Sequence, residues 1–484
     1  MREMDQGVHL KCCATNLIQS SGGYSLNEQA GMDRIQPSKF CTAVELRIQQ
    51  RTREIIIVNL KPAAPVSGRI LAALVIASVL VSSCGGGGGG SPTPSAPCVG
   101  SVPGTQTPPA PNGSNIIPVV IDAGPVSGTR EINVAYVSVQ VCPPGTSPPA
   151  STCQTIHHVQ LDTGSSGLRL LGSQFTSTNF PQVTTTPGGP AIGECAAFVI
   201  GTTWGSVRYA DIYLGGEVAK NVPFQDIGDT TWGYSTPPPD CSNMGVIQNT
   251  QASMGSNGLL GVGLFKNDCD ACITAAPPIP AAYYTCASTS CTSTMVTANQ
   301  VVQNPVADFA QDNNGVQINL PAVPSAGTNT ILNGSLIFGI GTQTNNSLPG
   351  TASVFDTDQY GNIITTYKGT SMNGSYLDSG SNALFFNDAT IATCSTNYWA
   401  YCPTPSPLAL SAINTAASGS PSGTVCFSVV GLDPIGANVV AANIGGPGTN
   451  NTFDWGLSFF FGRPVFTAIS GAITPAGTGP YFAY

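Results

Sequence analysis

The same short motif occurs twice in this chain, and the two copies lie 216 residues apart. Each copy is an apolar, β-rich run that ends in Asp and continues with Thr or Ser, then Gly and Ser. The copies are Leu161-Asp162-Thr163-Gly164-Ser165 and Leu377-Asp378-Ser379-Gly380-Ser381. Glycine permits a tight turn after each strand, and the hydroxyl side chains can bond to local backbone groups. The sequence therefore predicts two carboxylates, each presented by a turn at the end of a strand, in two halves of one fold.

Composition indicates that these halves are built from strands. The 484 residues include 56 Gly and 39 Pro, and only 8% of them are charged. Gly and Pro break helices, whereas Val and Thr suit pleated sheets. We therefore expect an all-β fold with few short helices.

The charge of the chain bears on its partners. After residue 83 the sequence carries seven Lys/Arg and 19 Asp/Glu. An acidic surface with few, scattered cations argues against a nucleic-acid partner.

An apolar-apolar-Gly motif follows each Asp turn. The first is Leu259-Leu260-Gly261, and the second is taken to be Phe460-Phe461-Gly462. This order of landmarks resembles the pepsin-like aspartic proteases, and the resemblance covers roughly residues 118–484. It implies a bilobal pepsin-like fold, with an N-terminal β lobe at 118–300 that carries Asp162 and a C-terminal β lobe at 301–484 that carries Asp378.

A second resemblance is to a bacterial lipoprotein family known only as a domain of unknown function. It is carried by the segments GSLIFGIGTQTNN and WGLSFFFG, together with a cysteine followed by a glycine tract. This resemblance implies no activity.

The first resemblance implies an endopeptidase in which a water is held between Asp162 and Asp378. Two carboxyls about 3 Å apart share one proton, because both cannot ionise cheaply. The ionised member would remove a proton from water, and the protonated member would donate to the scissile carbonyl. The expected partners are a peptide or protein substrate only, acted on by a monomer with no metal or cofactor. The supporting residues lie on the two turns. Thr163, Ser379 and the backbones of Gly164 and Gly380 would hold the carboxylates coplanar by hydrogen bonds, and Ser165 and Ser381 would contact the outer carboxylate oxygens.

A hairpin between the first turn and Leu259 is expected to close over the substrate. Two β runs, from Cys195 and from Gly205, flank the residues assigned to this flap. Pepsin-like proteases carry a tyrosine just before the turn, and here Ile200 is aligned with it and Trp204 with the tip. Trp204 either replaces the tyrosine ring or packs in the core. The assigned flap residues are Ile200, Gly201, Thr202, Thr203 and Trp204.

The main alternative is a pepsin-like fold that does not hydrolyse peptides and serves as a binding or surface module. Two intact Asp residues favour the enzyme, whereas the altered flap and the Asn382-Ala383 step favour the module. A Gly/Ser/Thr-rich adhesin is a third interpretation, but it leaves the repeated turns unexplained. A serine triad would have to use His157 or His158, and no G-x-S-x-G elbow precedes them.

Residues 66–83 resemble a bacterial lipoprotein signal. The apolar stretch 70–83 is too short for a bilayer span and follows Lys61 and Arg69. Cys84 would be lipidated, which implies an exported protein anchored at the cell envelope, on the outer membrane. Residues 1–65 are interpreted as an unstructured extension or as the product of a start codon assigned too far upstream. Residues 84–117, rich in Gly, Ser and Pro, are expected to form a tether.

Twelve cysteines follow Cys84, an even number that suits disulfides in an oxidising compartment. Proximity in sequence suggests three pairs: Cys142–Cys153, Cys286–Cys291 and Cys394–Cys402. Cys269 and Cys272 form a CxxC that we expect to be a local disulfide, or part of two bridges, in place of a zinc or redox site.

Overall fold

The computed structural model describes residues 98, 104, 107–110, 112–176, 179–274, 281–288 and 290–484. The expected extension at 1–65, the signal segment at 66–83, Cys84 and most of the expected tether lie outside the described residues. No helix within the described ranges is long and apolar enough to cross a membrane.

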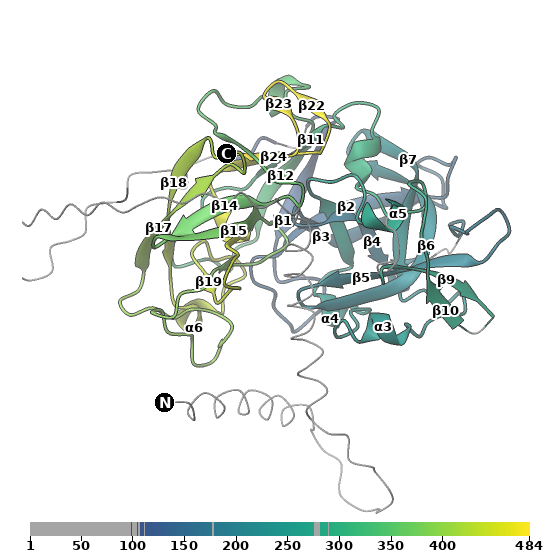
Figure 1. The fold of residues 1–484 in the computed structure, drawn as a ribbon, viewed down its shortest axis with the longest axis horizontal. Coiled ribbons are helices and arrows are strands. Elements are labelled where there is room, and N and C mark those ends of the chain that lie inside the picture. Colours follow the sequence, from purple (N-terminus) through teal and green to yellow (C-terminus); the bar gives the residue numbers. More distant parts are fainter. Residues whose placement is uncertain are drawn as a thin grey trace, which may run out of the picture. The chain divides into compact units, whose positions relative to one another are not determined.

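The described part of the chain is all-β with a few short helices, as the composition predicted. A 15-stranded sheet begins in the first half of the chain and continues into strands from the second half. Figure 1 shows the first-half strands in blue and teal on one side and the second-half strands in green and yellow on the other, with β1, β12 and β11 between them. The strands of the first half are β1 (Ile116–Ile121), β2 (Ala135–Cys142), β3 (Gln154–Asp162), β4 (Ser166–Leu171), β5 (Ala191–Phe198), β6 (Gly201–Leu214), β7 (Glu217–Ile227), β8 (Gly258–Val262), β9 (Tyr283–Ala287) and β10 (Ser290–Ser293).

The second half supplies the far end of this sheet and a separate seven-stranded sheet. Its strands in the large sheet are β11 (Gly315–Asn319), β12 (Leu332–Phe338), β13 (Val354–Asp356), β21 (Pro464–Ala468) and β24 (Tyr481–Ala483). The seven-stranded sheet contains β14 (Ile363–Tyr367), β15 (Thr370–Leu377), β16 (Leu384–Phe385), β17 (Leu408–Thr415), β18 (Ser422–Val429), β19 (Gly445–Gly446) and β20 (Asp454–Trp455). A small hairpin joins β22 (Ile473–Thr474) to β23 (Gly477–Thr478).

The helices in the described ranges are single turns that lie within loops. The α-helices are α3 (Pro239–Ser242), α4 (Gln251–Met254), α5 (Ala271–Thr274) and α6 (Leu432–Ile435). The 3-10 turns are η1 (Gly172–Gln174), η2 (Pro305–Asp308), η3 (Thr344–Asn346) and η4 (Leu457–Phe459). At η2 the side chain of Asn304 accepts from the Val306 N–H and Pro305 occupies the first turn, which are ordinary helix-start signals.

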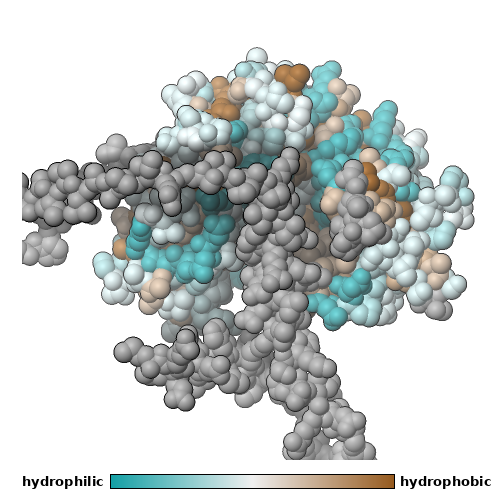
Figure 2. All heavy atoms as spheres, in the orientation of Figure 1, coloured by the Kyte–Doolittle hydropathy of each residue, from teal (hydrophilic) through white to brown (hydrophobic). Residues whose placement is uncertain are grey.

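One large apolar core runs through both halves. It extends from Ile117 and Val119 on β1 to Phe482 on β24, and its residues are almost completely buried. The visible face of the described residues is mostly hydrophilic or neutral, with scattered apolar spots (Figure 2). The core therefore holds the two halves together as one unit.

Six disulfides use the twelve cysteines that follow Cys84. The three pairs suggested by sequence proximity are all present, and Cys269–Cys272 is a local disulfide, one of the two uses expected for the CxxC. The remaining two connect distant segments, Cys195–Cys241 and Cys98–Cys426. Cys98 falls inside the segment expected to be a tether, so at this residue the segment is covalently fixed to β18.

Candidate active site

The two Asp turns sit in equivalent surroundings. In the first half, β3 ends at Asp162 and runs parallel to β8, β8 pairs antiparallel with β4, and β4 pairs parallel with β7. In the second half, β15 leads to Asp378 and runs parallel to β20, β20 pairs antiparallel with β16, and β16 pairs parallel with β19. The same arrangement of four strands therefore presents each carboxylate.

Hydrogen bonds within the first turn hold Asp162. The backbone N–H of Gly164 donates to Oδ1 of Asp162 at 2.7 Å. The hydroxyl of Ser165 donates to Oδ2 at 2.5 Å. Both carboxylate oxygens are thus fixed by donors two and three residues further along the chain.

The second turn repeats this pattern atom by atom. The N–H of Gly380 donates to Oδ1 of Asp378 at 2.7 Å, and the hydroxyl of Ser381 donates to Oδ2 at 2.9 Å. The two turns therefore orient their carboxylates in the same way, as the sequence motif predicted for the Gly and Ser residues.

Thr163 and Ser379 have a different role from the one expected. They were expected to hold the carboxylates coplanar by hydrogen bonds, but each hydroxyl instead bonds to the backbone of the opposite turn. Thr163 Oγ1 accepts from the Ser379 N–H and donates to the Leu377 carbonyl. Ser379 Oγ accepts from the Thr163 N–H and donates to the Leu161 carbonyl. These four bonds join the two turns directly.

The two carboxyl groups meet at this junction. A Cβ atom placed on Gly164 would lie 2.6 Å from Cγ of Asp378, and one on Gly380 would lie 2.6 Å from Oδ1 of Asp162. Both distances are shorter than any real Cβ contact, so only glycine allows each carboxylate to reach the opposite turn. The same Cβ on Gly380 would lie 3.1 Å from Oδ1 of Asp378, so the two carboxyls flank this one position.

Burial and the neighbouring carboxyl control the protonation of Asp162. Asp162 is buried, whereas Asp378 is half-buried. Burial raises the pKa of Asp162 well above its usual value, and the charge and hydrogen bond of Asp378 raise it further. The hydrogen bonds from Ser165 and Gly164 act in the opposite direction but do not reverse the shift. Asp162 is therefore the member that retains a proton more readily than an ordinary Asp.

The glycine strand behind the first turn is where the sequence predicted it. Asp162 pairs with Gly261 in the parallel ladder, and Leu161 pairs with Leu260. A Cβ on Gly261 would lie 2.8 Å from Ser165 Oγ and 2.7 Å from the Ser166 carbonyl carbon. Gly261 thus lets β8 pass directly beneath the turn.

The corresponding assignment in the second half is wrong. Leu377 pairs with Trp455, so the residue beneath Asp378 is Gly456, and a Cβ there would lie 2.7 Å from the Ser381 carbonyl oxygen. Phe460–Gly462 instead follow η4 and lead into β21. The counterpart of Leu259-Leu260-Gly261 is Asp454-Trp455-Gly456. The sequence analysis looked for two apolar residues before a Gly, and it missed this segment because its first residue is an acid.

Asp454 is consequently a site residue that the sequence analysis missed. It is buried, and its Oδ1 atom has no hydrogen-bond partner among the described residues. Burial raises its pKa well above the usual value for Asp, and the charges of Asp378 and Asp162 raise it further. A third carboxyl therefore lies within electrostatic reach of the pair.

The hairpin assigned to the flap exists, but its turn is elsewhere. In the β5–β6 ladder Phe198 pairs with Gly201, so the turn residues are Val199 and Ile200. Ile200 is therefore in the turn and not on the strand before it. Phe198 occupies the position before the turn where an aromatic ring was sought, and its ring lies 5.6 Å from the guanidinium of Arg169.

Trp204 is a core residue and not the tip of the hairpin. It is only 2% exposed and pairs with Cys195 inside the ladder. Its ring centroid lies 5.5 Å from that of Trp232 and 5.3 Å from that of Tyr284. Gly201, Thr202 and Thr203 are likewise buried on β6.

The tip itself is apolar and exposed. Val199 is 99% exposed and Ile200 is 67% exposed. Val246, 73% exposed, lies beside them, because its carbonyl accepts from the Thr202 N–H and the Gln248 side chain donates to the Ile200 carbonyl. Three adjacent aliphatic side chains at one tip form the surface that we call the hairpin tip.

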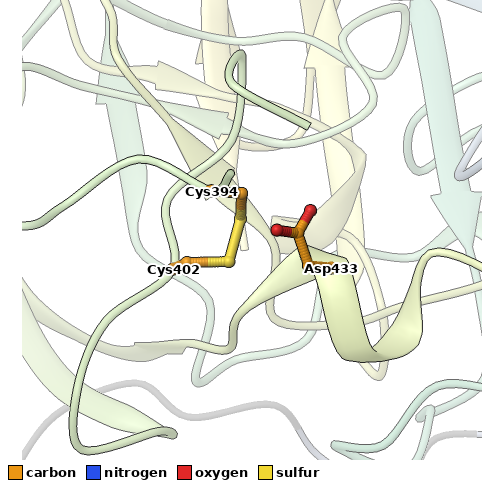
Figure 3. A group of neighbouring side chains, drawn as sticks. All are labelled: Cys394, Cys402 and Asp433. Carbon is orange, nitrogen blue, oxygen red and sulfur yellow. A yellow bond between two sulfur atoms is a disulfide. The ribbon is translucent and has the colours of Figure 1, made fainter. Parts of the chain in front are cut away.

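The two histidines before the first Asp turn bond to residues outside the Asp pair. His157 bonds with Ser138 and His158 with Asp122, so neither histidine contacts the Asp pair. Cys394, Cys402 and Asp433 lie together (Figure 3), but the two sulfurs form a disulfide and so offer no thiolate. The Asp433 carboxylate accepts from the backbone of Ser395, Thr396 and Asn397, which lowers its pKa to about 2.

Two cavities are lined by neither Asp. One of about 520 Å³ lies between β7 and the 298–308 segment and includes Lys220, Lys266 and Tyr209. Another, of about 360 Å³, lies beside β14 and includes Lys368 and Asp388.

Comparison with known families accounts for nearly all of the described chain. A family model described as "Protein of unknown function (DUF3443)" matches residues 111–484, which contain both Asp turns and Asp454. No match was found among curated proteins. The match spans well over half of the sequence, and the chain belongs to the DUF3443 family.

Proposed function

We propose that this protein is a pepsin-like aspartic endopeptidase that hydrolyses peptide bonds with a water held between Asp162 and Asp378. The observation that carries the proposal is the close approach of each carboxyl to the glycine of the opposite, equivalent turn, with each carboxyl oriented by a Gly N–H and a Ser hydroxyl. Two independent motifs 216 residues apart converge on one point, which a coincidental turn motif does not explain.

The chemistry follows from the shared proton. The raised pKa of Asp162 favours that residue as the protonated member, which donates to the scissile carbonyl. Asp378 is then the base that removes a proton from the attacking water. Departure of the amine and return of the proton to the pair complete the cycle, so no covalent intermediate is needed.

The hairpin tip is the element we assign to substrate contact. Val199, Ile200 and Val246 would bury apolar surface against a bound peptide, which offsets the cost of leaving them exposed in the free protein. Phe198 stacks with Arg169, which lies on the strand that leaves the first Asp turn, and this contact connects the hairpin to the turn.

A silent pepsin-fold binding or surface module is the second candidate. It is favoured by the low exposure of Asp162, at 6%, and by cavities of about 520 and 360 Å³ that are lined by neither Asp. For this candidate the Asp pair would serve structure alone, and the ligand would bind elsewhere.

Inhibitor binding and hydrolysis distinguish the two candidates. Titration calorimetry at pH 4 should detect binding of a statine inhibitor such as pepstatin, and a peptide library analysed by mass spectrometry should show cleavage. Asp162→Asn and Asp378→Asn should abolish both and keep the native circular dichroism spectrum. Residual cleavage in either variant, or absence of inhibitor binding by the intact protein, would refute the enzyme.

We also propose that the protein is an exported lipoprotein, anchored at the cell envelope through Cys84. Six disulfides support an oxidising compartment. Radiolabelled palmitate should be incorporated into the full chain expressed in a Gram-negative host and lost in Cys84→Ala. Equal labelling of the variant would rule out this anchor.

A further inference from the structure

Arg169 occupies a position at which the two halves of the fold differ. It lies on β4, seven residues after Asp162, and β4 pairs antiparallel with β8. In the second half Phe385 lies on β16, seven residues after Asp378, and β16 pairs antiparallel with β20. The strand arrangement around each Asp turn therefore accepts an apolar residue at this position, so the arginine must serve a contact that only the first half makes.

Stability alone does not account for the arginine. Arg169 is 2% exposed and Glu194 is fully buried. Nη2 of Arg169 donates to Oε1 of Glu194 at 2.5 Å and to Oδ2 of Asp268 at 2.7 Å, so one guanidinium serves two carboxyl groups. Nε of Arg169 and Oε2 of Glu194 are buried without a hydrogen-bond partner among the described residues. Apolar residues of similar volume often stabilise a fold as well as such a buried ion pair does.

One side of the guanidinium contacts the first Asp turn. Nη1 of Arg169 donates to the Ser166 carbonyl at 2.9 Å. Ser166 directly follows Ser165, whose hydroxyl donates to Asp162. A movement of Arg169 would therefore be transmitted to the residues that orient this carboxylate.

The same guanidinium contacts the hairpin at two positions. Glu194 and Phe198 both lie on β5, and their even spacing places both side chains on one face of the strand. Glu194 accepts from Nη2, and the ring centroid of Phe198 lies 5.6 Å from the guanidinium carbon, within the range of a cation–π contact. Phe198 directly precedes Val199 and Ile200, so Arg169 contacts β5 as far as the turn that carries the hairpin tip.

We propose that Arg169 is a positioning residue that fixes the β5–β6 hairpin, and with it the hairpin tip, against the turn that carries Asp162. Asp268, which also accepts a hydrogen bond from Tyr283, holds the guanidinium from a third segment. This inference deepens the proposed endopeptidase function and rests on it for its catalytic meaning. A peptide bound at the hairpin tip would be held at a fixed distance from Asp162.

Amide NMR of the two turn glycines, in the full disulfide-bonded chain, tests this link without requiring hydrolysis. Gly164 and Gly380 donate to equivalent Asp oxygens, but Arg169 contacts the turn of Gly164. Phe198→Leu and Glu194→Gln change side chains of the hairpin only, yet each should shift the amide signal of Gly164 and leave that of Gly380 in place. An unmoved Gly164 signal in both variants would overturn the proposal.

Two arginine variants separate positioning from the burial of charge. Arg169→Lys keeps the charge but loses the planar fork that reaches three partners, so it should also shift the Gly164 signal. Arg208→Lys is the matched control, because Arg208 is likewise buried beside two acids, Asp226 and Asp229, and its hydrogen bonds go to other segments. The control should leave both glycine signals in place. An equal shift in Arg208→Lys would assign the effect to the buried charge and overturn the proposal.

Kinetics on a peptide that the protein cleaves give a second measurement. Arg169→Lys and Phe198→Leu should raise KM about tenfold, the equivalent of losing the burial of one aliphatic side chain, and should change kcat by less than about twofold. A residue needed only for folding would instead reduce the amount of active protein, which lowers the apparent kcat and leaves KM unchanged. That pattern in both variants would overturn the proposal.

Outcomes for this inference and for the proposed function are distinguishable. If the Gly164 signal responds to the hairpin variants but no peptide is cleaved, the endopeptidase proposal fails and the link through Arg169 stands. If peptides are cleaved, and Phe198→Leu and Arg169→Lys leave both KM and the Gly164 signal unchanged, the link is refuted alone.

Discussion

Thr163 and Ser379 exchange hydrogen bonds across the junction of the two halves: the Thr163 N–H donates to Ser379 Oγ at 3.0 Å, and the Ser379 N–H donates to Thr163 Oγ1 at 2.9 Å. Both residues are at most 2% exposed. Each side chain therefore satisfies a buried backbone donor of the opposite turn. The distance between Asp162 and Asp378 depends on this exchange, because each Asp directly precedes one of the two residues.

Removing either hydroxyl should cost stability. Thr163→Val and Ser379→Ala each leave a buried N–H without an acceptor, which is expected to lower the free energy of unfolding by about 1–3 kcal/mol. Urea denaturation followed by tryptophan fluorescence measures the loss. Thr330→Val, at an exposed position, is the matched control and should change the free energy of unfolding by less than about 0.5 kcal/mol. Equal stability of all three variants would show that the exchange does not join the turns.

Adding one carbon atom between the two carboxyls should disable the pair. In Gly164→Ala and Gly380→Ala the new methyl would lie 2.6 Å from an atom of the opposite Asp, so the turns must separate. We expect inhibitor affinity and any peptide cleavage to fall by about 100-fold or more, as displacements of about 1 Å do in active sites. Gly350→Ala meets no atom within 4 Å and should leave both unchanged. Calorimetry and peptide cleavage assays compare the three variants. Inhibitor affinity equal to that of the intact protein in Gly164→Ala or Gly380→Ala would mean that the carboxyls lie further apart than described.

Contacts within one turn of the site could be predicted from the sequence, whereas contacts between distant segments could not. Asp162, Gly164 and Ser165 act within one turn, so their spacing fixes their geometry. The partners of Thr163 lie on the opposite turn, and no local pattern indicates them. Disulfides behave the same way: Cys142–Cys153 closes a short hairpin, whereas Cys195–Cys241 depends on how distant strands meet.

The two wrong assignments have a common physical cause. Gly201-Thr202-Thr203-Trp204 reads as a turn, yet all four residues lie on β6. A Cβ on Gly201 would be 2.2 Å from the backbone oxygen of Val246, so this glycine allows a close approach and does not mark the turn. A glycine required by close strands cannot be told from a turn glycine by sequence. Similarly, Asp454 occupies a position where an apolar residue was sought, and only the ladder with β15 identifies it.

Asp226 should make the protein less stable as pH rises from about 4 to 7. Its carboxyl is buried on β7, and Arg208 donates through two nitrogens to Asp229, so Asp226 is the less compensated partner. Burial, then the charge of Asp229, raises the pKa of Asp226 to about 7. The folded state therefore holds a proton that the unfolded chain releases above about pH 4, and stability falls through this window by up to about 1.4 kcal/mol per pH unit.

Asp226→Asn tests this origin of the pH dependence. The amide cannot ionise, so the free energy of unfolding of the variant, relative to that of the intact protein, should increase as pH rises from 4 to 7. Urea denaturation at several pH values measures this difference. Asp240→Asn, at an exposed position, should follow the intact protein throughout. Parallel curves for Asp226→Asn and the intact protein would show that Asp226 titrates normally.

The Cys98–Cys426 disulfide should stabilise the fold more than any short-range bridge. It closes a loop with a sequence separation of 328 residues, whereas Cys269–Cys272 closes one of three. Chain entropy of the unfolded state then predicts losses of about 6 kcal/mol for Cys98→Ser with Cys426→Ser and about 2 kcal/mol for Cys269→Ser with Cys272→Ser. The segment is also held where the Gly104 N–H donates to the Gly462 carbonyl, and Ser335 donates to the Pro109 carbonyl, so part of its native position survives loss of the bridge. Urea denaturation without reductant measures both double variants. If removing Cys269–Cys272 lowered the free energy of unfolding more than removing Cys98–Cys426, the long bridge would not act as a constraint on the unfolded chain. It would then only attach residue 98 to the fold.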